Sequence, residues 1–199
     1  MSEHYFSQNP QSKSSPKKWN YQLRGEIFKF ESDYGVFSKN EVDYGSRLLI
    51  EYFEEPPVEG SLLDLGCGYG PIGIAIANSY KKRSVMLTDI NERAVALARK
   101  NAHYNDVNNV EFAISDRFSH LKDRKFAAIL TNPPIRAGKK IVHQMFEESK
   151  HVLLENGQLW VVIKKKQGAP SAMNKLNDLF GDVEVIDRSK GYYILMTTK

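Results

Sequence analysis

Little in this chain supports a disulfide-bonded, metal-binding or membrane-spanning protein. Cys67 is the only cysteine, so the sequence can form neither an internal disulfide nor a cysteine zinc cluster. The five histidines do not show metal-ligand spacing such as His-x-x-x-His, so no metal is expected. No apolar run approaches the roughly 18 residues of a membrane span, and the N-terminus is polar, so we expect neither a signal peptide nor an anchor. These absences predict a cytoplasmic protein with no membrane partner.

Composition is typical of one globular domain. The 199 residues are 41% hydrophobic, which is enough for one substantial core. Residues 1–18 are rich in Ser, Lys, Gln and Pro and predict a polar N-terminal tail, leaving residues 19–199 as a single domain. The net charge of +4 favours an anionic partner, although many basic proteins bind no nucleic acid. We expect a monomer.

Apolar segments of strand and helix type alternate along most of the chain. Strands are expected from about residue 61 and then at residues 84–89, 110–115, 126–130, 157–163, 182–186 and 192–197. Helices are expected at residues 43–53, 71–80, 91–104, 140–154 and 171–180. This alternation predicts an α/β fold with βαβ units in a Rossmann-like, doubly wound, mainly parallel sheet of seven strands.

The two ends of the predicted domain depart from this alternation. The last two strands are joined by about five residues around Gly191, too few for a parallel crossover, so the last strand is expected to be antiparallel. Residues 19–57 contain a strand-like ribbon followed by a helix. We therefore expect a small N-terminal β/α cap on a Rossmann-like core at residues 58–199.

The sequence LLDLGCGYGPIG at residues 62–73 is the strongest local signal. An apolar run there ends in an acid and opens into closely spaced glycines: Asp64, Gly66, Gly68 and Gly70. Glycine has no Cβ, so such a loop can adopt positive φ and bring its backbone against a ligand before a helix N-terminus. A dinucleotide fingerprint would need its third glycine at Pro71, and no Gly-Lys-Ser/Thr closes a P-loop. The simplest alternative is a tight strand-to-helix turn without a ligand.

Polar residues follow four of the predicted strands, at Asp64, Asp89, Ser115 with Asp116, and Asn132. The carboxyl ends of parallel strands meet at one edge of a sheet, where ligands bind. Asp89 follows the glycine loop by about twenty residues, the spacing at which a carboxylate accepts hydrogen bonds from both hydroxyls of a ribose. Its alternative role is the N-cap of the helix that begins near Asn91.

The glycine loop matches in register the first motif, acid-x-Gly-x-Gly-x-Gly, of the class I S-adenosylmethionine-dependent methyltransferases, which this sequence resembles. The resemblance implies S-adenosyl-L-methionine as the cofactor. It also implies a role for each polar strand end: the glycine loop and Asp89 would contact the cofactor, Asp116 beside Ser115 would meet the adenine amino group, and Ile90 would pack on the adenine face. A solvated loop position is the alternative for Asp116.

A second signal is Asn132-Pro133-Pro134-Ile135. Methyl transfer to an NH₂ group of guanine, adenine or an amide needs a nitrogen lone pair that is otherwise delocalised. The Asn132 side-chain carbonyl and the Pro133 main-chain carbonyl would each accept one N–H and favour a pyramidal nitrogen, while the prolines stiffen the loop. No strong general base is needed. The alternative is a proline-rich loop that only ends a strand.

Residues 37–49, FSKNEVDYGSRLL, together with Asn-Pro-Pro and the Gly-Lys that follows, resemble the catalytic half of the bacterial 16S ribosomal RNA guanine-N2 methyltransferases of the small-subunit methyltransferase C family. The resemblance runs from about residue 19 to the C-terminus. It implies guanine N2 of small-subunit ribosomal RNA as the methyl acceptor, with ribosomal RNA or the small subunit as partner. It further implies that Phe37, Asp43 and Gly45 are lid contacts at the methionine end of the cofactor, where Asn132 also lies. A capped core helix is the alternative for Asp43.

Substrate contacts are expected beyond the Asn-Pro-Pro loop. Ile135 stands where many amino-methyltransferases have an aromatic residue that stacks on the target base, so apolar packing is expected there instead. Nearby cations would bind phosphates flanking the target nucleotide, namely Arg136, Lys139, Lys164 and Lys165. A solvated basic surface is the alternative.

Two other functions remain open at this point. Protein glutamine and DNA adenine N-methyltransferases also use Asn-Pro-Pro, but they typically have Tyr or Phe at the place of Ile135. A non-catalytic RNA-binding or cofactor-sensing module is the third, and the intact Gly66, Gly68, Asp89 and Asn132 argue against it.

Overall fold

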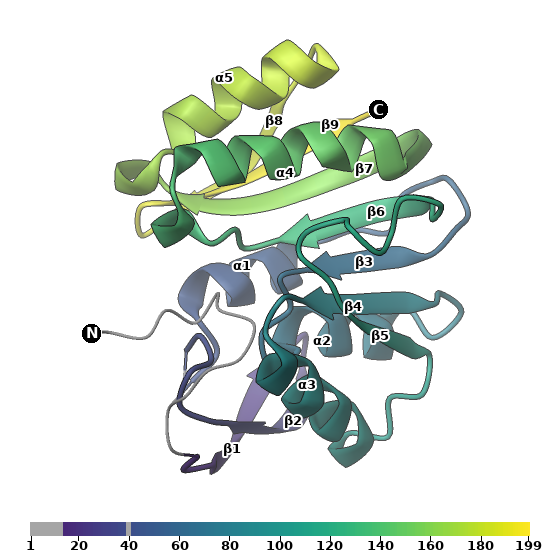
Figure 1. The fold of residues 1–199 in the computed structure, drawn as a ribbon, viewed down its shortest axis with the longest axis vertical. Coiled ribbons are helices and arrows are strands. Elements are labelled where there is room, and N and C mark those ends of the chain that lie inside the picture. The colour runs from purple at the N-terminus through teal and green to yellow at the C-terminus, as the bar shows by residue number, and fades with distance from the viewer. Residues whose placement is uncertain (1–13, 39–40) are drawn as a thin grey trace.

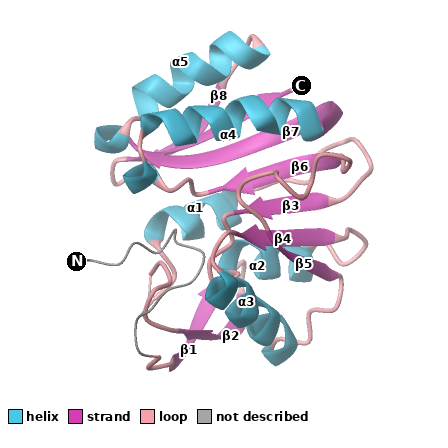
Figure 2. Cartoon of the chain, in the orientation of Figure 1, coloured by secondary structure: helices cyan, strands magenta, loops and turns pink. Residues whose placement is uncertain are grey.

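The computed structural model describes residues 14–38 and 41–199. Its centre is a seven-stranded sheet with the order β5-β4-β3-β6-β7-β9-β8 (Figures 1 and 2). In sheet order the strands are β5 (Val110–Ile114), β4 (Val85–Asp89), β3 (Leu62–Leu65), β6 (Phe126–Thr131), β7 (Leu153–Lys164), β9 (Tyr192–Thr198) and β8 (Glu184–Ser189). The first five are parallel, and β9 is antiparallel to both of its neighbours. The predicted α/β sheet with an antiparallel last strand is confirmed.

Helices cover both faces of this sheet. One face carries α1 (Tyr44–Tyr52), α2 (Pro71–Ser79) and α3 (Glu92–Tyr104), and the other carries α4 (Lys139–Val152) and α5 (Ala169–Phe180). Successive residues of a strand point to opposite faces, so Leu62 packs in the first layer and Leu63 in the second. Burial on both faces explains why the central strands are continuous apolar runs rather than alternating ones.

The N-terminal cap is a hairpin of β1 (Lys17–Leu23) and β2 (Glu26–Ser32), paired antiparallel. Asn101 of α3 binds it: its side chain accepts from the Glu31 N–H and donates to the Glu31 carbonyl, both at 2.8 Å. The same amide donates to the Tyr69 carbonyl at 2.8 Å. One buried side chain therefore joins the cap, α3 and the glycine loop.

Several predicted element boundaries differ from the observed ones. β1 begins at Lys17, inside the segment expected to be a tail, and residues 1–13 of that segment lie outside the described residues. β7 begins at Leu153 rather than 157, because buried Leu153 pairs with Phe126 before the polar residues that look like a turn. β8 spans residues 184–189 rather than 182–186. In the described part of the chain, no helix combines the length and apolar character needed to cross a membrane.

Candidate active site

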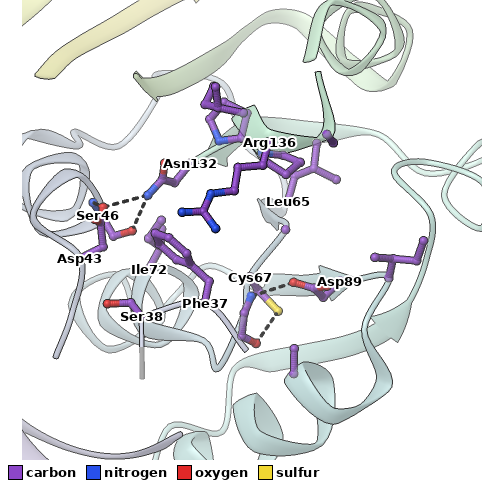
Figure 3. A pocket seen from close by; sticks show the side chains of 18 of the residues that line it. Phe37, Ser38, Asp43, Ser46, Leu65, Cys67, Ile72, Asp89, Asn132 and Arg136 are labelled. Carbon is purple, nitrogen blue, oxygen red and sulfur yellow. Dashed lines mark hydrogen bonds between the residues drawn. The ribbon is translucent and has the colours of Figure 1, made fainter. Parts of the chain in front are cut away.

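A cavity of about 900 Å³ opens at the carboxyl ends of β3, β4, β5 and β6 (Figure 3). Most of the predicted site residues line it: Phe37, Asp43, Gly66, Gly68, Asp89, Ile90, Ser115, Asp116, Asn132, Pro133, Pro134, Ile135, Arg136 and Lys164. Among the described residues, the candidates that do not form part of its wall are Gly45, Asp64, Gly70, Lys139 and Lys165. Asp89 and Asn132, from separate strands, thus open into one space, as expected for the switch edge of a parallel sheet.

The glycine loop meets the cavity through its backbone. Gly66 and Gly68 have φ values of 79° and 56°, and a Cβ built on either would meet nothing within 4 Å. Positive φ, rather than lack of space, therefore favours glycine at these two positions. Gly70 differs, because its Cβ would lie 2.8 Å from Ile74 Cδ1 and 3.1 Å from Ala98 Cβ. It allows the loop to pack against α3.

Asp64 lies beneath this loop and holds the start of α2. Its Oδ2 accepts a hydrogen bond of 2.8 Å from the Gly73 N–H. Its Oδ1 is buried, and no donor in the described part of the chain reaches it. Desolvation raises the pKa of Asp64 from 3.8 to about 7. Asp64, the first acid of the motif, therefore fixes the first turn of α2, the helix that follows the glycine loop.

Asp89 is fixed by two backbone donors. Its Oδ2 accepts from the Gly68 N–H and its Oδ1 from the Asn91 N–H, each at 2.9 Å. Each carboxylate oxygen can accept a further hydrogen bond. Burial raises the pKa of Asp89 above its ordinary value. The N-cap of α3 is Asn91, whose side chain accepts from the Arg93 and Ala94 N–H groups, so Asp89 is not needed as the cap.

The loop after β5 contributes Ser115, Asp116 and Arg117 to the cavity wall. Ile90 and Ala94, which follow β4, supply apolar surface to the same wall. One Asp116 oxygen accepts from Arg117 Nη1 at 2.9 Å. The Ser115 hydroxyl donates to the Arg117 carbonyl at 3.0 Å, so this side chain shapes the loop. No sequence pattern indicated Ala94 or Arg117 as cavity residues.

The Asn132 amide is held in one orientation (Figure 3). Its Nδ2 donates to Asp43 Oδ2 and to Ser46 Oγ, both at 3.0 Å. A carboxylate only accepts hydrogen bonds, so the NH₂ end must face Asp43. The carbonyl end, Oδ1, is then left as the acceptor that is available to a ligand.

Asp43 organises the surroundings of that amide. It is the N-cap of α1, accepting from the Ser46 N–H at 3.1 Å, and its Oδ1 accepts from the Tyr192 hydroxyl at 3.3 Å. Gly45 makes this possible, because a Cβ there would lie 2.6 Å from Tyr192 Cε1. Sequence reasoning missed Ser46 and Tyr192. The Asp-x-x-Ser spacing of a helix start was a signal for Ser46, whereas Tyr192 is 149 residues from Asp43 and had none.

The Asn-Pro-Pro backbone completes the site. Thr131 ends β6 and donates its hydroxyl to the Leu65 carbonyl at 2.9 Å, which ties this strand end to the glycine-loop strand. In the described residues no N–H donates to the Pro133 carbonyl. Two carbonyl acceptors, from Asn132 and Pro133, are therefore next to each other in the chain and beside the same cavity. The described residues contain no group of His, Cys, Asp and Glu that could hold a metal ion.

The chain is similar to known proteins in both sequence and structure. The sequence model of the family described as Methyltransferase small domain matches residues 27–196. The chain is 56% identical over 200 residues to Uncharacterized protein YbxB of Bacillus subtilis (strain 168), with full coverage of both chains. It is 30% identical to Ribosomal RNA large subunit methyltransferase G of Klebsiella pneumoniae (strain 342), covering 96% of this chain and 51% of that protein.

One solved structure is similar over nearly the whole chain. It is the T. thermophilus 16S rRNA N2 G1207 methyltransferase (RsmC) in complex with AdoMet and guanosine, with a TM-score of 0.83 and 24% identity. The match covers 96% of this chain and 52% of that one, so the chain spans about half the length of these two named methyltransferases. A methyltransferase from Pyrococcus furiosus matches with a TM-score of 0.65 and 18% identity, over 83% of this chain and 90% of that one. These likenesses show the fold.

Proposed function

This chain belongs to the methyltransferase small domain family, and we propose that it is an S-adenosylmethionine-dependent N-methyltransferase acting on guanine N2 of small-subunit ribosomal RNA. The observation that carries the proposal is the fixed Asn132 amide, whose carbonyl is kept available in the cavity that also holds Asp89 and the glycine loop. A module that only bound the cofactor would not need that arrangement.

The cavity wall fits the cofactor part by part. Asp89 has acceptor capacity for the two ribose hydroxyls, and Ile90 with Ala94 offers apolar surface for the adenine. The backbone of Gly66 and Gly68 faces open space where a ligand can approach closely. S-Adenosylmethionine supplies a methyl group on a positively charged sulfur, which leaves as a neutral thioether when the C–N bond forms.

The residues of this chain then act on the acceptor. Asn132 Oδ1 and the Pro133 carbonyl accept the two N–H bonds of the exocyclic amine and orient its lone pair into the cavity. The nitrogen becomes acidic as the new bond forms, and its extra proton passes to solvent. Asp43 and Ser46 keep the Asn132 amide from turning over during this step.

The nucleic-acid substrate is favoured by charge and by the relatives. Arg136 reaches into the cavity beside Asn132 and Lys164 lines it, which suits a polyanion (Figure 3). The T. thermophilus and K. pneumoniae proteins are named as ribosomal RNA methyltransferases, the former for N2 of a guanine. Ile135, which offers no aromatic ring, counts against the protein glutamine and DNA adenine alternatives.

Three measurements test the proposal. Titration calorimetry with S-adenosylmethionine should show binding, and ribosomal RNA from a deletion strain should accept labelled methyl groups when the purified enzyme is added. Nucleoside analysis of that strain should show less N2-methylguanosine in small-subunit RNA. A normal N2-methylguanosine level would contradict the assigned acceptor.

Asn132→Ala is the matching variant. It should bind the cofactor and lose methyl incorporation by about 100-fold or more, because it removes one of the two acceptors for the amine. Asn174→Ala, at an exposed position on α5, is the control and should keep full activity. Unchanged incorporation by Asn132→Ala would overturn the catalytic assignment.

A further inference from the structure

A group of aromatic and cationic side chains continues from the cavity wall onto the neighbouring surface. The rings of Tyr44 on α1 and Tyr192 on β9 lie 5.7 Å apart at an interplanar angle of 49°. Lys164 Nζ lies 4.7 Å from the centre of the Tyr192 ring. Lys190 Nζ and Arg47 Cζ lie 4.7 Å and 5.0 Å from the centre of the Tyr44 ring. We call these five residues the tyrosine-cation cluster.

In the part of the chain that the structure describes, the cations of this cluster form no ion pair with an acidic side chain. Other lysines and arginines do have one, such as Lys100 with Glu31 and Arg83 with Glu55. Within residues 14–38 and 41–199, by contrast, no carboxylate forms an ion pair with Arg47, Lys164 or Lys190. Among the described residues, no hydrogen-bond acceptor reaches the buried Arg47 Nε. The cluster therefore concentrates three positive charges that no ion pair within the described residues neutralises.

Its position connects it to the methyl-acceptor site. Lys164 and Tyr192 line the cavity, and the Tyr192 hydroxyl donates to Asp43, which holds Asn132. Tyr44 and Lys190 continue the cluster outward over α1 and the β8–β9 turn, at the edge where the parallel strands end (Figure 1). Tyr44 is fixed to that turn by a hydrogen bond of 2.8 Å between its hydroxyl and that of Ser189.

We propose that the tyrosine-cation cluster binds the phosphates on one side of the target nucleotide, so that the RNA strand leaves the cavity over α1 and the β8–β9 turn. Cations already lie against both tyrosine rings, so we assign the tyrosines the role of orienting the charges rather than stacking on bases. Long side chains held on rings lose less freedom when they bind an anion. The inference rests on the proposed function, because a nucleic acid places phosphates directly beside the acceptor base and a protein amide does not.

The test uses RNA affinity as a function of salt. The probe is a fluorescein-labelled single-stranded 20-nucleotide RNA of mixed sequence, measured by anisotropy from about 50 to about 200 mM salt. The variant is Arg47→Gln with Lys190→Gln, which removes two charges and leaves a shorter, neutral polar side chain at each position. Each lost contact to a single strand should lower the slope of log affinity against log salt by about 0.7, so the double variant should lose about 1.4. Its affinity at low salt should fall about 10-fold.

The control is Lys81→Gln with Lys82→Gln, two exposed lysines in the turn before β4 at the opposite edge of the sheet. It removes the same net charge and should leave the slope unchanged. Lys190→Arg changes the side chain at the turn but keeps its charge, so it should keep the wild-type slope. S-Adenosylmethionine affinity should be the same in all variants.

The outcomes separate the two proposals. If the Arg47 and Lys190 variant keeps the wild-type slope while the wild type methylates RNA, the cluster proposal is wrong and the proposed function stands. If the wild type binds S-adenosylmethionine and methylates no RNA, the proposed function fails. A slope that falls equally in the cluster variant and the Lys81 and Lys82 control shows only a general charge effect and also overturns the cluster proposal.

Discussion

Asp43 Oδ2 and Asn132 Nδ2 are joined by a hydrogen bond of 3.0 Å between residues that lie 89 positions apart in the chain. Asp43 is the N-cap of α1, and Asn132 directly follows the central strand β6. The bond decides which end of the Asn132 amide faces the cavity. Asp43, which the resemblance implies as a cofactor contact, lines the cavity and also holds the Asn132 amide, so we propose that it positions this amide for the methyl acceptor.

Replacing Asp43 by Asn should therefore impair turnover. An amide at position 43 can face Asn132 with either its NH₂ or its carbonyl group, so the orientation of Asn132 is no longer enforced. Hydrogen bonds to charged groups contribute about 1.5–3 kcal/mol, so kcat should fall about 10- to 100-fold while the cofactor Kd stays within about twofold. Ser46→Ala, which removes the other acceptor of the same NH₂ group, should cost less. A higher Kd with unchanged kcat would favour a cofactor contact instead.

Gly45→Ala should disturb the same network through packing. The new Cβ would lie 2.6 Å from Tyr192 Cε1, so the ring has to move away from Asp43. Overpacking of this kind costs about 1–3 kcal/mol in the free energy of unfolding, measured with urea. Combining Gly45→Ala with Tyr192→Ala should remove the clash, so the two losses should not add. Strict additivity would show that the two side chains do not interfere.

Stability should depend on the protonation of Asp64. Its pKa is about 7 in the folded protein against 3.8 as the ordinary value, so the folded state binds the proton more tightly than the unfolded chain. The contribution of Asp64 is most favourable below pH 4 and is lost as the pH rises from about 4 to about 7, by about 4 kcal/mol. Asp64→Asn keeps an acceptor for the Gly73 N–H and should flatten this dependence.

Urea unfolding at pH 4.5 and pH 7.5 measures the effect. The Asp64→Asn variant should gain stability over the wild type at the higher pH and little at the lower one. Asp178→Asn, at an exposed position on α5, is the control and should follow the wild type at both. Equal stability of Asp64→Asn and wild type at pH 7.5 would show that ionisation of the buried Asp64 carboxyl does not destabilise the folded protein.

Cofactor affinity should depend more on Asp89 than on Asp116. Asp89 is fixed by two backbone N–H groups, whereas the Asp116 side chain is 54% exposed and paired with Arg117. Preorganised, desolvated acceptors contribute more than exposed ones. Asp89→Ala should raise the Kd of S-adenosylmethionine at least 10-fold in calorimetry, and Asp116→Ala should raise it only a few-fold. The reverse order would contradict the assignment of Asp89 to the ribose.

The sequence alone determined the fold class and which polar residues end at the ligand-binding edge. Continuous apolar runs predict the buried strands. Residues at the carboxyl ends of parallel strands lie at one edge of the sheet, so the sequence alone predicts that Asp89 and Asn132 are close in space. The same reasoning could not separate the motif positions that face the cavity from those beneath it. Asp64 and Gly70 match the motif as well as Gly66 and Gly68 do, yet they act on α2 and α3.

Only the tertiary structure decided how the Asn132 amide is held in place. The partners of Asn132 are 86 and 89 residues away, and Tyr192 reaches Asp43 because α1 packs against β9 at Gly45. The same packing brings Arg47 and Lys190 onto one tyrosine ring. Local periodicity records which face of an element is buried, but the side chains that meet across two elements depend on the distance and angle at which those elements pack.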